Sequence, residues 1–536
     1  MGKKEGKFVF SRTSSGLRRE WSIFDAFIFN GAYMNPLVHG FLALSLIPAF
    51  WGGADLIMVT ILGVIVFVPV MWCYAWMGSS MPRAGGDYVY VSRILAPSVG
   101  FMTVITLTIT LVGWAAADAL KEATYFLQPL FSLTGNSGLA EWVMSFNGLV
   151  TVGVIFIIVS LTIVGMGMKW WSRILKWSGF WTYAGIIIVL VLLGVSSHTD
   201  FVNAFNNFMS PTVGINAYQQ VIDTSRSAGL SFAGYNWPDT LVAFLFMGSA
   251  AYAWCSVSTA HLSEIKGVDK VWRNTFSSVG AVLVGSGIML LFYYLFPRVV
   301  GWEFWTGLNY LYFTGQGGSL SPAMPYFPYF VSLLGGGLFV VLLFVFWMCS
   351  VSGDLVVITM DIGNTVKYWF ASAFDGILPR RLADVNQRTG APIKALILFG
   401  AAFLAWSVIG WLNPLYAIGT IFVANGVVIL ISNLATTVSS IAFPYRKKEV
   451  YEASPIARYK VAGIPVISIV GVIGTITSLL FLYWFATTPV MGVTLESSII
   501  ALSVYAIAGV IYVISRVMRK RQGIDLSLAF KELPPA

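Results

Sequence analysis

Two carboxylates stand in and just beyond a long apolar stretch of the chain, residues 329–358, where an ionisable side chain is expensive to bury. Asp354 and Asp361 are seven residues apart, so on a helix they share one face, about 10 Å from each other. Ser350 and Ser352 lie beside Asp354, and hydroxyl and carboxylate oxygens suit a small cation. Asp354 could instead carry a proton. A buried aspartate satisfied by serines or water is the alternative that needs no function.

A second group of charged residues, Asp118, Lys121 and Glu122, falls near one end of the apolar stretch 98–128. Asp118 is one helical turn from the other two, so the simplest interpretation is a self-paired cluster at a membrane edge. Asp118 could also attract a cationic substrate. We expect Asp361 to pair with a base, either Lys367 or an arginine from another loop. Candidates for a cytoplasmic gate are Asp25, Asp361, Lys367 and Glu264.

The first apolar stretch, SIFDAFIFNGAYMNPLVHGFLALSLIPAF, is predicted to be an interrupted helix. Pro36 has no N–H, and its ring clashes with the carbonyl of Ala32, four residues back. Asn35 is pushed away from helical angles, and Gly31 tolerates the backbone that results. A carbonyl freed at mid-membrane needs a partner: an ion, a substrate, or the amide of Asn30 or Asn35. A plain proline kink is the alternative.

The sixth apolar stretch has a patch of small residues, 248–251, between Phe246 and Tyr252. Close helix packing would explain this patch equally well. Its position favours a second break, because the first and sixth stretches open two halves of similar make-up. Interrupted helices at matching places are typical of inverted-repeat transporters, whose site lies at mid-membrane. Half-helix N-termini there favour a carboxylate, and freed carbonyls favour an ammonium or a cation.

These patterns give two sets of candidate residues. The substrate-binding candidates are Asn30, Gly31, Ala32, Tyr33, Met34, Asn35, Phe246, Gly248, Ser249, Ala250, Tyr252 and Asp118. The ion-coupling candidates are Asp354, Ser350, Ser352 and the carbonyl of Ala32.

About twelve apolar spans position these residues. Mean hydropathy is +0.79 and 10% of residues are charged, and a membrane helix needs about 20 mostly apolar residues. The composition therefore predicts an all-α integral membrane protein. The spans are 22–47, 56–80, 98–128, 147–166, 172–195, 239–262, 276–299, 329–358, 392–411, 413–443, 462–486 and 496–518.

Positive charge fixes the orientation of these spans. If they alternate from a cytoplasmic N-terminus, 29 of the 32 Lys and Arg residues are cytoplasmic, all except Lys121, Arg226 and Arg298. Shifting the register by one span would invert this bias, so both termini are predicted to be cytoplasmic. Orientation also explains the net charge of +9, and nucleic-acid binding is not expected. The bilayer is the expected partner, and the basic N-terminus could attract anionic lipid.

Several classes of function are excluded. The three cysteines fall inside predicted spans, and the three histidines are scattered without the spacing of a metal site. There is no phosphate-binding GxxxxGK[ST] run and no stretch long enough for an ATPase domain. No cofactor is expected. A secondary transporter or a channel remains, and a membrane-embedded enzyme would need clustered acids, histidines or a metal site at one face.

Three stretches carry motifs of a known family, and the first and third of them are specific; in the second, Gly267 and Val268 stand where Asn-Pro is usual. Residues 80–101 read SMPRAGGDYVYVSRILAPSVGF, residues 263–274 read SEIKGVDKVWRN, and residues 367–396 read KYWFASAFDGILPRRLADVNQRTGAPIKAL. Together they resemble the amino acid–polyamine–organocation (APC) superfamily over about residues 20–518. The matching positions are Pro82, Gly85, Gly86, Tyr88, Tyr90, Glu264, Lys266, Asp375, Gly376, Pro379, Gly390, Pro392, Ala395 and Leu396.

The resemblance implies a leucine-transporter-type fold, a five-plus-five inverted repeat with two further C-terminal helices. It implies a transporter of amino acids or related amines in the plasma membrane, working by alternating access. H+ symport, Na+ symport and exchange are all open, as is the oligomeric state. The implied segments are a cytoplasmic N-terminus (1–20), a first repeat (21–195), an extracellular loop (196–238), a second repeat (239–443), a cytoplasmic loop (444–461), two C-terminal helices (462–518) and a cytoplasmic tail (519–536).

The chain departs from the family where specificity resides. The glycine-rich run usual in the first span is replaced by Asn35 and Pro36, which weakens the inference of an α-amino-acid substrate. The gating aromatic expected at Ala250 is missing, and Phe246 could substitute for it. The fifth span also lacks the lysine that some proton-coupled relatives carry near residues 180–183. A polyamine or organic-cation carrier therefore stays open, and a ligand sensor on a transporter fold is a minor alternative.

Overall fold

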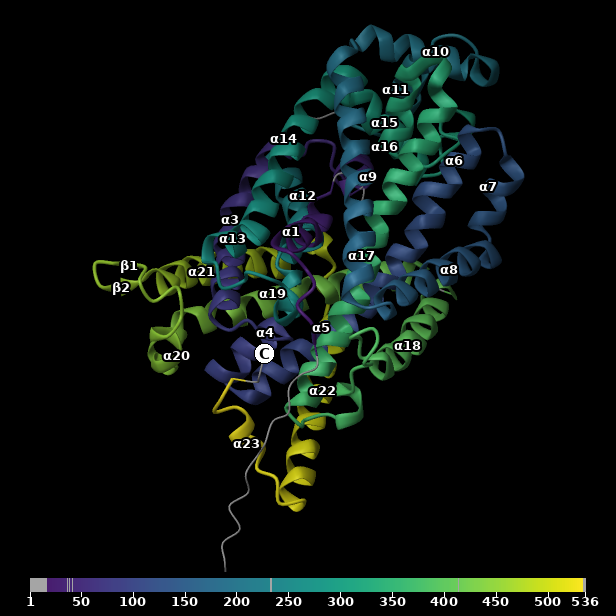
Figure 1. The fold of residues 1–536 in the computed structure, drawn as a ribbon. Coiled ribbons are helices and arrows are strands. Elements are labelled where there is room, and N and C mark those ends of the chain that lie inside the picture. Colours follow the sequence, from purple (N-terminus) through teal and green to yellow (C-terminus); the bar gives the residue numbers. More distant parts are fainter. Residues whose placement is uncertain are drawn as a thin grey trace, which may run out of the picture.

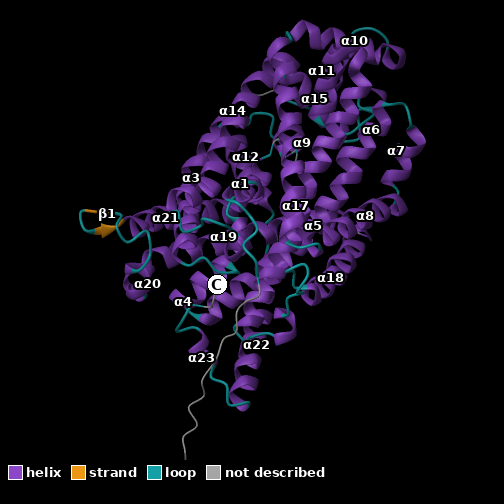
Figure 2. Ribbon diagram, viewed as in Figure 1, coloured by secondary structure: helices purple, strands orange, loops and turns teal. Residues whose placement is uncertain are grey.

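The computed structural model describes residues 17–35, 37, 39–40, 42–231, 234–412 and 414–533. Apart from one short two-stranded ribbon, β1 (Lys460–Val461) with β2 (Ile464–Pro465), its regular elements are helical (Figure 2). The α-helices are α1 (Ile23–Gly31), α2 (Ile47–Phe50), α3 (Leu56–Ser80), α4 (Gly86–Ile94), α5 (Pro97–Lys121), α6 (Gln128–Leu133), α7 (Ser137–Met144), α8 (Phe146–Gly165), α9 (Met168–Val195), α10 (His198–Val213), α11 (Ala217–Ser227), α12 (Trp237–Ala250), α13 (Val271–Thr275), α14 (Ala281–Val300), α15 (Trp302–Phe313), α16 (Phe327–Val331), α17 (Phe339–Phe374), α18 (Ile393–Leu412), α19 (Pro414–Arg446), α20 (Lys448–Glu452), α21 (Val466–Thr487), α22 (Leu495–Arg521) and α23 (Leu526–Ala529).

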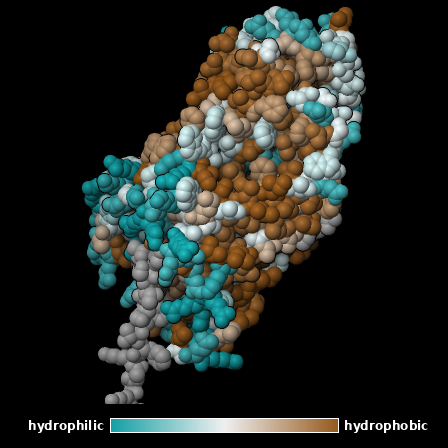
Figure 3. Space-filling view, turned by 45° about the vertical axis from the view of Figure 1, so that its right-hand side comes forward, coloured by the Kyte–Doolittle hydropathy of each residue, from teal (hydrophilic) through white to brown (hydrophobic). Residues whose placement is uncertain are grey.

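Ten helical segments in the described part of the chain are long and apolar enough to cross a membrane. They run from 56–80 to 497–521, and residues 393–405 form a shorter apolar helix. Figure 3 shows the consequence: apolar side chains cover most of this face, and hydrophilic ones gather toward its ends. The predicted all-α membrane fold is confirmed.

The first apolar stretch is broken as predicted. Helix α1 ends at Gly31, a 3-10 turn covers Ala32–Met34, and Asn35 is extended (φ −77°, ψ 119°). Helical structure resumes as a π-helix at Leu42–Leu46 and continues into α2. Pro36, on which the prediction rested, lies outside the described residues.

The sixth stretch is also broken at the predicted patch. Helix α12 ends at Ala250, and Ala251 departs from helical geometry (φ −118°, ψ −62°). The chain continues as 3-10 turns at Tyr252–Trp254 and Val257–Glu264. Two interrupted helices therefore exist in this fold, and their broken segments contact each other.

Two long helices lie beside the breaks. Helix α5 runs into a π-helical segment, Glu122–Leu127, directly after Lys121, and α17 is continuous over 36 residues. The two pack against each other. Single π turns often mark functional positions, because they insert a residue and turn its neighbours relative to the helix face.

The loop 196–238 is largely helical. It forms α10 and α11, which pack with α15 at one end of the molecule, far from α4 and α23 at the other (Figure 1). The end with α4 and α23 is the one predicted to face the cytoplasm.

Candidate functional site

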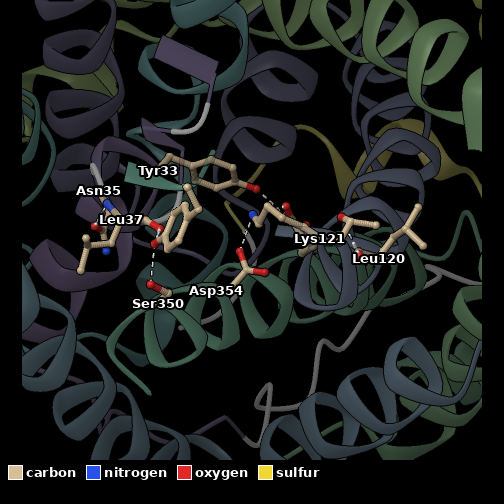
Figure 4. Close-up of polar contacts among 11 residues, drawn as sticks. Tyr33, Asn35, Leu37, Leu120, Lys121, Ser350 and Asp354 are labelled. Atoms are coloured by element: carbon tan, nitrogen blue, oxygen red, sulfur yellow. Dashed lines mark hydrogen bonds and ion pairs between the residues drawn. The ribbon is translucent and has the colours of Figure 1, made fainter. Parts of the chain in front are cut away.

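Lys121 is the centre of a buried ionic cluster between α5 and α17 (Figure 4). Its ammonium Nζ is 2.7 Å from Asp118 Oδ1 and 2.5 Å from Asp354 Oδ1. The side chains of Lys121 and Asp354 are 4% and 0% exposed. The predicted pair between Asp118 and Lys121 is therefore confirmed. It is not a self-contained pair at the membrane edge, because Asp354 joins it from across the helix interface.

Acidic groups outnumber basic ones in this cluster. Glu122 is fully buried beside Lys121, and neither of its carboxylate oxygens has a hydrogen-bond partner among the described residues. One oxygen each of Asp118 and Asp361 and both oxygens of Asp354 also lack a hydrogen-bond partner there, although Asp354 Oδ1 forms the ion pair with Lys121. A buried carboxylate without a donor is strongly unfavourable, so these atoms mark a place where a proton, a cation or a substrate group belongs.

Tyr33 connects the first break to this cluster. Its hydroxyl donates to Asp361 Oδ1 at 2.7 Å. Its ring stacks on His39 (centroids 5.0 Å apart) and on Trp254 (5.4 Å). Tyr33 and His39 belong to the first stretch, Trp254 follows the break in the sixth, and Asp361 lies on α17. The expected pairing of Asp361 with a base is wrong, because its observed partner is a tyrosine hydroxyl.

The two asparagines of the first stretch satisfy backbone groups. Asn30 Nδ2 donates to Ser277 O at 2.7 Å, and Asn30 Oδ1 accepts from Ser258 N at 2.9 Å. Asn30 therefore links α1 to the segments that follow α12 and precede α14. Asn35 Oδ1 accepts from Leu37 N at 2.9 Å, which stabilises the turn after the break.

A small cavity of about 10 Å³ lies between the first break, α9 and α17, room for about one water molecule. Gly31, Ala32 and Asn35 line it from the first stretch, and Thr182 and Gly353 are among the residues that line it from the helices. Of the four ion-coupling candidates, Ala32 lines this cavity, and Asp354, Ser350 and Ser352 do not.

The two serines do not gather around Asp354. Ser350 Oγ donates to Phe346 O at 2.7 Å and contacts the hydroxyl of Tyr326. Ser352 Oγ donates to Met348 O at 2.7 Å, in an exposed position on α17. Asp354 contacts the ammonium of Lys121 instead of these hydroxyls.

The sixth-stretch candidates mostly pack against neighbouring helices. A Cβ on Gly248 would lie 2.4 Å from the Phe481 ring on α21. The Tyr252 hydroxyl points to Ser286 Oγ on α14, 3.3 Å away. The Phe246 ring contacts Trp51 at 5.3 Å.

The remaining candidates are equally enclosed. Ser249 Oγ bonds back to Leu245 O at 2.8 Å, and Met34 and Ala250 are buried. A Cβ on Gly285 of α14 would lie 2.5 Å from Met34. Of the aromatic side chains after the sixth break, Trp254 is the one stacked on Tyr33.

The gate candidates form two ion pairs. Lys367 Nζ is 2.6 Å from Glu264 Oε2 in a buried pair, and His261 Nδ1 is 3.6 Å from the same oxygen. Asp25 Oδ1 lies 3.3 Å from Lys176 Nζ on α9. The sequence suggested Lys367 as a partner of Asp361, but Lys367 pairs with Glu264 instead.

Backbone hydrogen bonds close the same end of the molecule. Trp21 N donates to Glu264 O at 3.0 Å, and Lys266 N donates to Trp21 O at 2.8 Å. The Trp21 ring packs on Phe29 (4.8 Å) and on His261 (5.2 Å). The segment before α1 is thus joined to the segment after the sixth stretch at this end of the molecule.

Sequence analysis did not select three residues that the structure places in or beside the site: His39, Trp254 and Glu122. His39 has both ring nitrogens without a hydrogen-bond partner among the described residues. A lone histidine inside an apolar span was the available signal. Trp254 was seen only as part of an aromatic pattern, and its stacking on Tyr33 could not be read from spacing.

Comparisons with known proteins agree with this architecture. A family model described as amino acid permease matches residues 23–512. The chain is 23% identical to the large neutral amino acids transporter small subunit 2 of Homo sapiens over 281 residues, 49% of this chain and 50% of that protein. The protein of the same name from Mus musculus is 26% identical over 190 residues, 34% of each chain. Asc-type amino acid transporter 1 of Homo sapiens is 23% identical over 263 residues, 45% of this chain and 47% of that protein. The chain spans half or less of the length of these relatives.

Proposed function

This chain belongs to the amino acid permease family, and we propose that it is a secondary transporter of amino acids or related amines. It works by alternating access in the plasma membrane, with both termini in the cytoplasm. The relatives are named as amino acid transporters, which supports the substrate class. The distribution of Lys and Arg supports the orientation. Membership of a transporter family argues against an enzymatic function.

The observation that carries the proposal is the meeting of the two interrupted helices at Tyr33 and Trp254. Helix α1 ends at Gly31 and α12 ends at Ala250, so the C-terminal carbonyls of both point toward the same interior region. Helix C-termini carry partial negative charge and favour an ammonium group. Helical segments that restart beyond the breaks present N–H groups, which favour a carboxylate. An amino acid has both groups.

Asn30 and the small residues near Gly31 and Ala32 shape the substrate site in this proposal. Trp254 and Tyr33 form its aromatic wall, with His39 behind the tyrosine ring. Gly248 and Tyr252 contribute through packing instead, because their neighbours are α21 and α14.

A polyamine carrier is disfavoured by the ionic cluster. Such a substrate needs carboxylates that face the pocket without an internal cation. Asp118 and Asp354 are both held by Lys121, at 2.7 and 2.5 Å. A polycation would have to displace a buried ammonium before it could use them.

The pair Glu264–Lys367 and the pair Asp25–Lys176 are proposed as the cytoplasmic gate. Each joins elements that are distant in sequence: the end of the sixth stretch with α17, and α1 with α9. Opening toward the cytoplasm has to separate them.

Uptake and counterflow of labelled amino acids and polyamines in proteoliposomes test the function. Counterflow is expected for one class of amino acid, and Trp254→Ala is expected to abolish it because the aromatic wall is lost. Trp177→Ala is the matched control, since Trp177 is 65% exposed on α9. Transport of diamines without amino acids would contradict the proposal, as would unchanged counterflow in Trp254→Ala.

A further inference from the structure

We propose that Glu122 and Asp354 together hold the proton that this transporter moves with its substrate, so that the protein is a proton symporter. The inference rests on the proposed transport function and names its coupling ion and the residues that bind it. Glu122 takes up the proton in this scheme, and Lys121 keeps Asp354 in place beside it.

Charge counting gives the first argument. Asp118, Glu122, Asp354 and Asp361 surround a single ammonium, that of Lys121, and all five side chains are buried. If every carboxyl were ionised, the cluster would carry three net negative charges inside the membrane. Moving one unpaired carboxylate into a low-dielectric interior costs several kcal/mol even after relaxation, on the order of 20 in the idealised limit. Some of these carboxyls must therefore hold protons.

Hydrogen bonding identifies Glu122 as the strongest candidate. Two tyrosines near Glu122 direct their hydroxyls elsewhere: Tyr326 donates to Leu37 O at 2.7 Å, and Tyr329 donates to Phe126 O at 3.1 Å. Asp361 differs, because Tyr33 donates to it. Asp118 and Asp354 each contact the ammonium of Lys121. Among the four carboxyls, Glu122 and Asp354 have both oxygens without a hydrogen-bond partner in the part of the chain that the structure describes, and of these two it is Asp354 that contacts the Lys121 ammonium.

The other elements around Glu122 bring no compensating charge. Helices α6 and α8 contain no acidic, basic, histidine or tyrosine residue. Helix α7 has Glu141, which is exposed. The titratable groups that face Glu122 are those of Asp118 and Lys121 on α5, Asp354 on α17, and Tyr326 and Tyr329 in and beside α16.

Glu122 and Asp354 lie on elements that pack against each other, and Lys121, the neighbour of Glu122 in the chain, contacts Asp354 at 2.5 Å. Two ionised carboxylates cannot form a hydrogen bond, because both are acceptors. One proton between them supplies the donor and removes one negative charge. A metal cation fits less well. Lys121 already holds one Asp354 oxygen, and the described residues include no group of three or more acidic, histidine or cysteine side chains arranged to hold a metal ion.

The transport step balances without any further reactant. When the site opens outward, the Glu122 carboxylate binds one proton from the outer solution. When the site opens to the cytoplasm, Glu122 releases that proton there. Net movement is one proton per cycle with the substrate, and no covalent bond changes.

The test is substrate-driven proton movement in proteoliposomes that enclose a pH-sensitive dye, with counterflow measured in parallel. Glu122→Gln is expected to keep counterflow and to lose both substrate-driven acidification and accumulation driven by a pH gradient. Glu122→Asp, which can still bind a proton, is expected to retain part of the coupling. Glu141→Gln is the control and should behave as wild type.

Labelling gives a second measurement that needs no variant. Dicyclohexylcarbodiimide reacts with protonated carboxyls in apolar surroundings, and Glu122 is expected to be modified, less so as the pH rises. Wild-type counterflow without acidification, sodium-driven accumulation, full coupling in Glu122→Gln, or no labelling of Glu122 would each overturn the inference. Absence of wild-type counterflow for any amino acid would instead overturn the transport function itself.

Discussion

Removing the ammonium of Lys121 is the most direct perturbation of the ionic cluster. Lys121→Met keeps a side chain of similar length but leaves Asp118 and Asp354 without their shared partner. Deleting one member of a buried ion pair typically costs about 3–5 kcal/mol, because a charge stays buried without compensation. With two carboxylates affected, we expect a loss at the upper end of that range at pH 8.

The loss of stability in Lys121→Met should depend on pH, and proton linkage gives the direction of that dependence. Without Lys121, the folded protein avoids a buried unpaired carboxylate by binding a proton in the cluster. The folded variant then binds more protons than its unfolded state, so its stability rises as the pH falls. The slope is about 1.4 kcal/mol per pH unit for each extra proton. The destabilisation relative to wild type is therefore largest at pH 8 and smaller at pH 5.5.

Thermal unfolding in detergent, followed by tryptophan fluorescence, measures this effect, since the chain has 20 tryptophans. Lys520→Met, at an exposed site on α22, is the control. The double variant Lys121→Met/Asp354→Asn should recover part of the lost stability, because one orphaned charge is removed with its partner. An unfolding midpoint equal to wild type at both pH values would refute the reasoning, and so would a loss that does not change with pH.

Two further predictions concern groups away from the cluster. Burial raises the pKa of Asp87 on α4 to about 6, so wild type should lose roughly 3 kcal/mol of stability as the pH rises from about 4 to beyond 6. Asp87→Asn should flatten this part of the curve of unfolding midpoint against pH. An unchanged curve in Asp87→Asn would contradict the prediction. Gly248→Ala places a Cβ 2.4 Å from Phe481, so this variant should lose about 1–3 kcal/mol of stability by overpacking. The KM for the substrate should stay unchanged. A changed KM with normal stability would instead place Gly248 in the substrate site.

The first helix break could be predicted because its cause is local, and the second because it lies at the matching place in the second half of the chain. Proline has no N–H and disfavours helical angles at the residue before it, whereas the small residues 248–251 alone would fit close helix packing equally well. The same local reasoning identified Asp118 and Lys121 as a pair, since they are one turn apart on α5.

Partners across helix interfaces could not be predicted, because they depend on how each helix is rotated and how deep it sits. Asp361 and Lys367 are both on α17 and looked like a pair. Their actual partners, Tyr33 and Glu264, come from the two interrupted stretches. Spacing places residues on a face of a helix, but it does not say which neighbour that face meets.

The arrangement links substrate binding to the acidic cluster through one hydroxyl. Tyr33 belongs to the broken first stretch, and its hydrogen bond to Asp361 reaches the continuous helix α17, which also carries Asp354. If the site proposed above is correct, a substrate ammonium that binds near the broken ends approaches Asp361 and competes with Tyr33 for it. That adds positive charge to one side of the cluster and makes an ionised Asp361 more favourable. In the proposed symporter the substrate ammonium and the transported proton therefore belong to different carboxyls, Asp361 and Glu122, so that binding the substrate does not displace the proton.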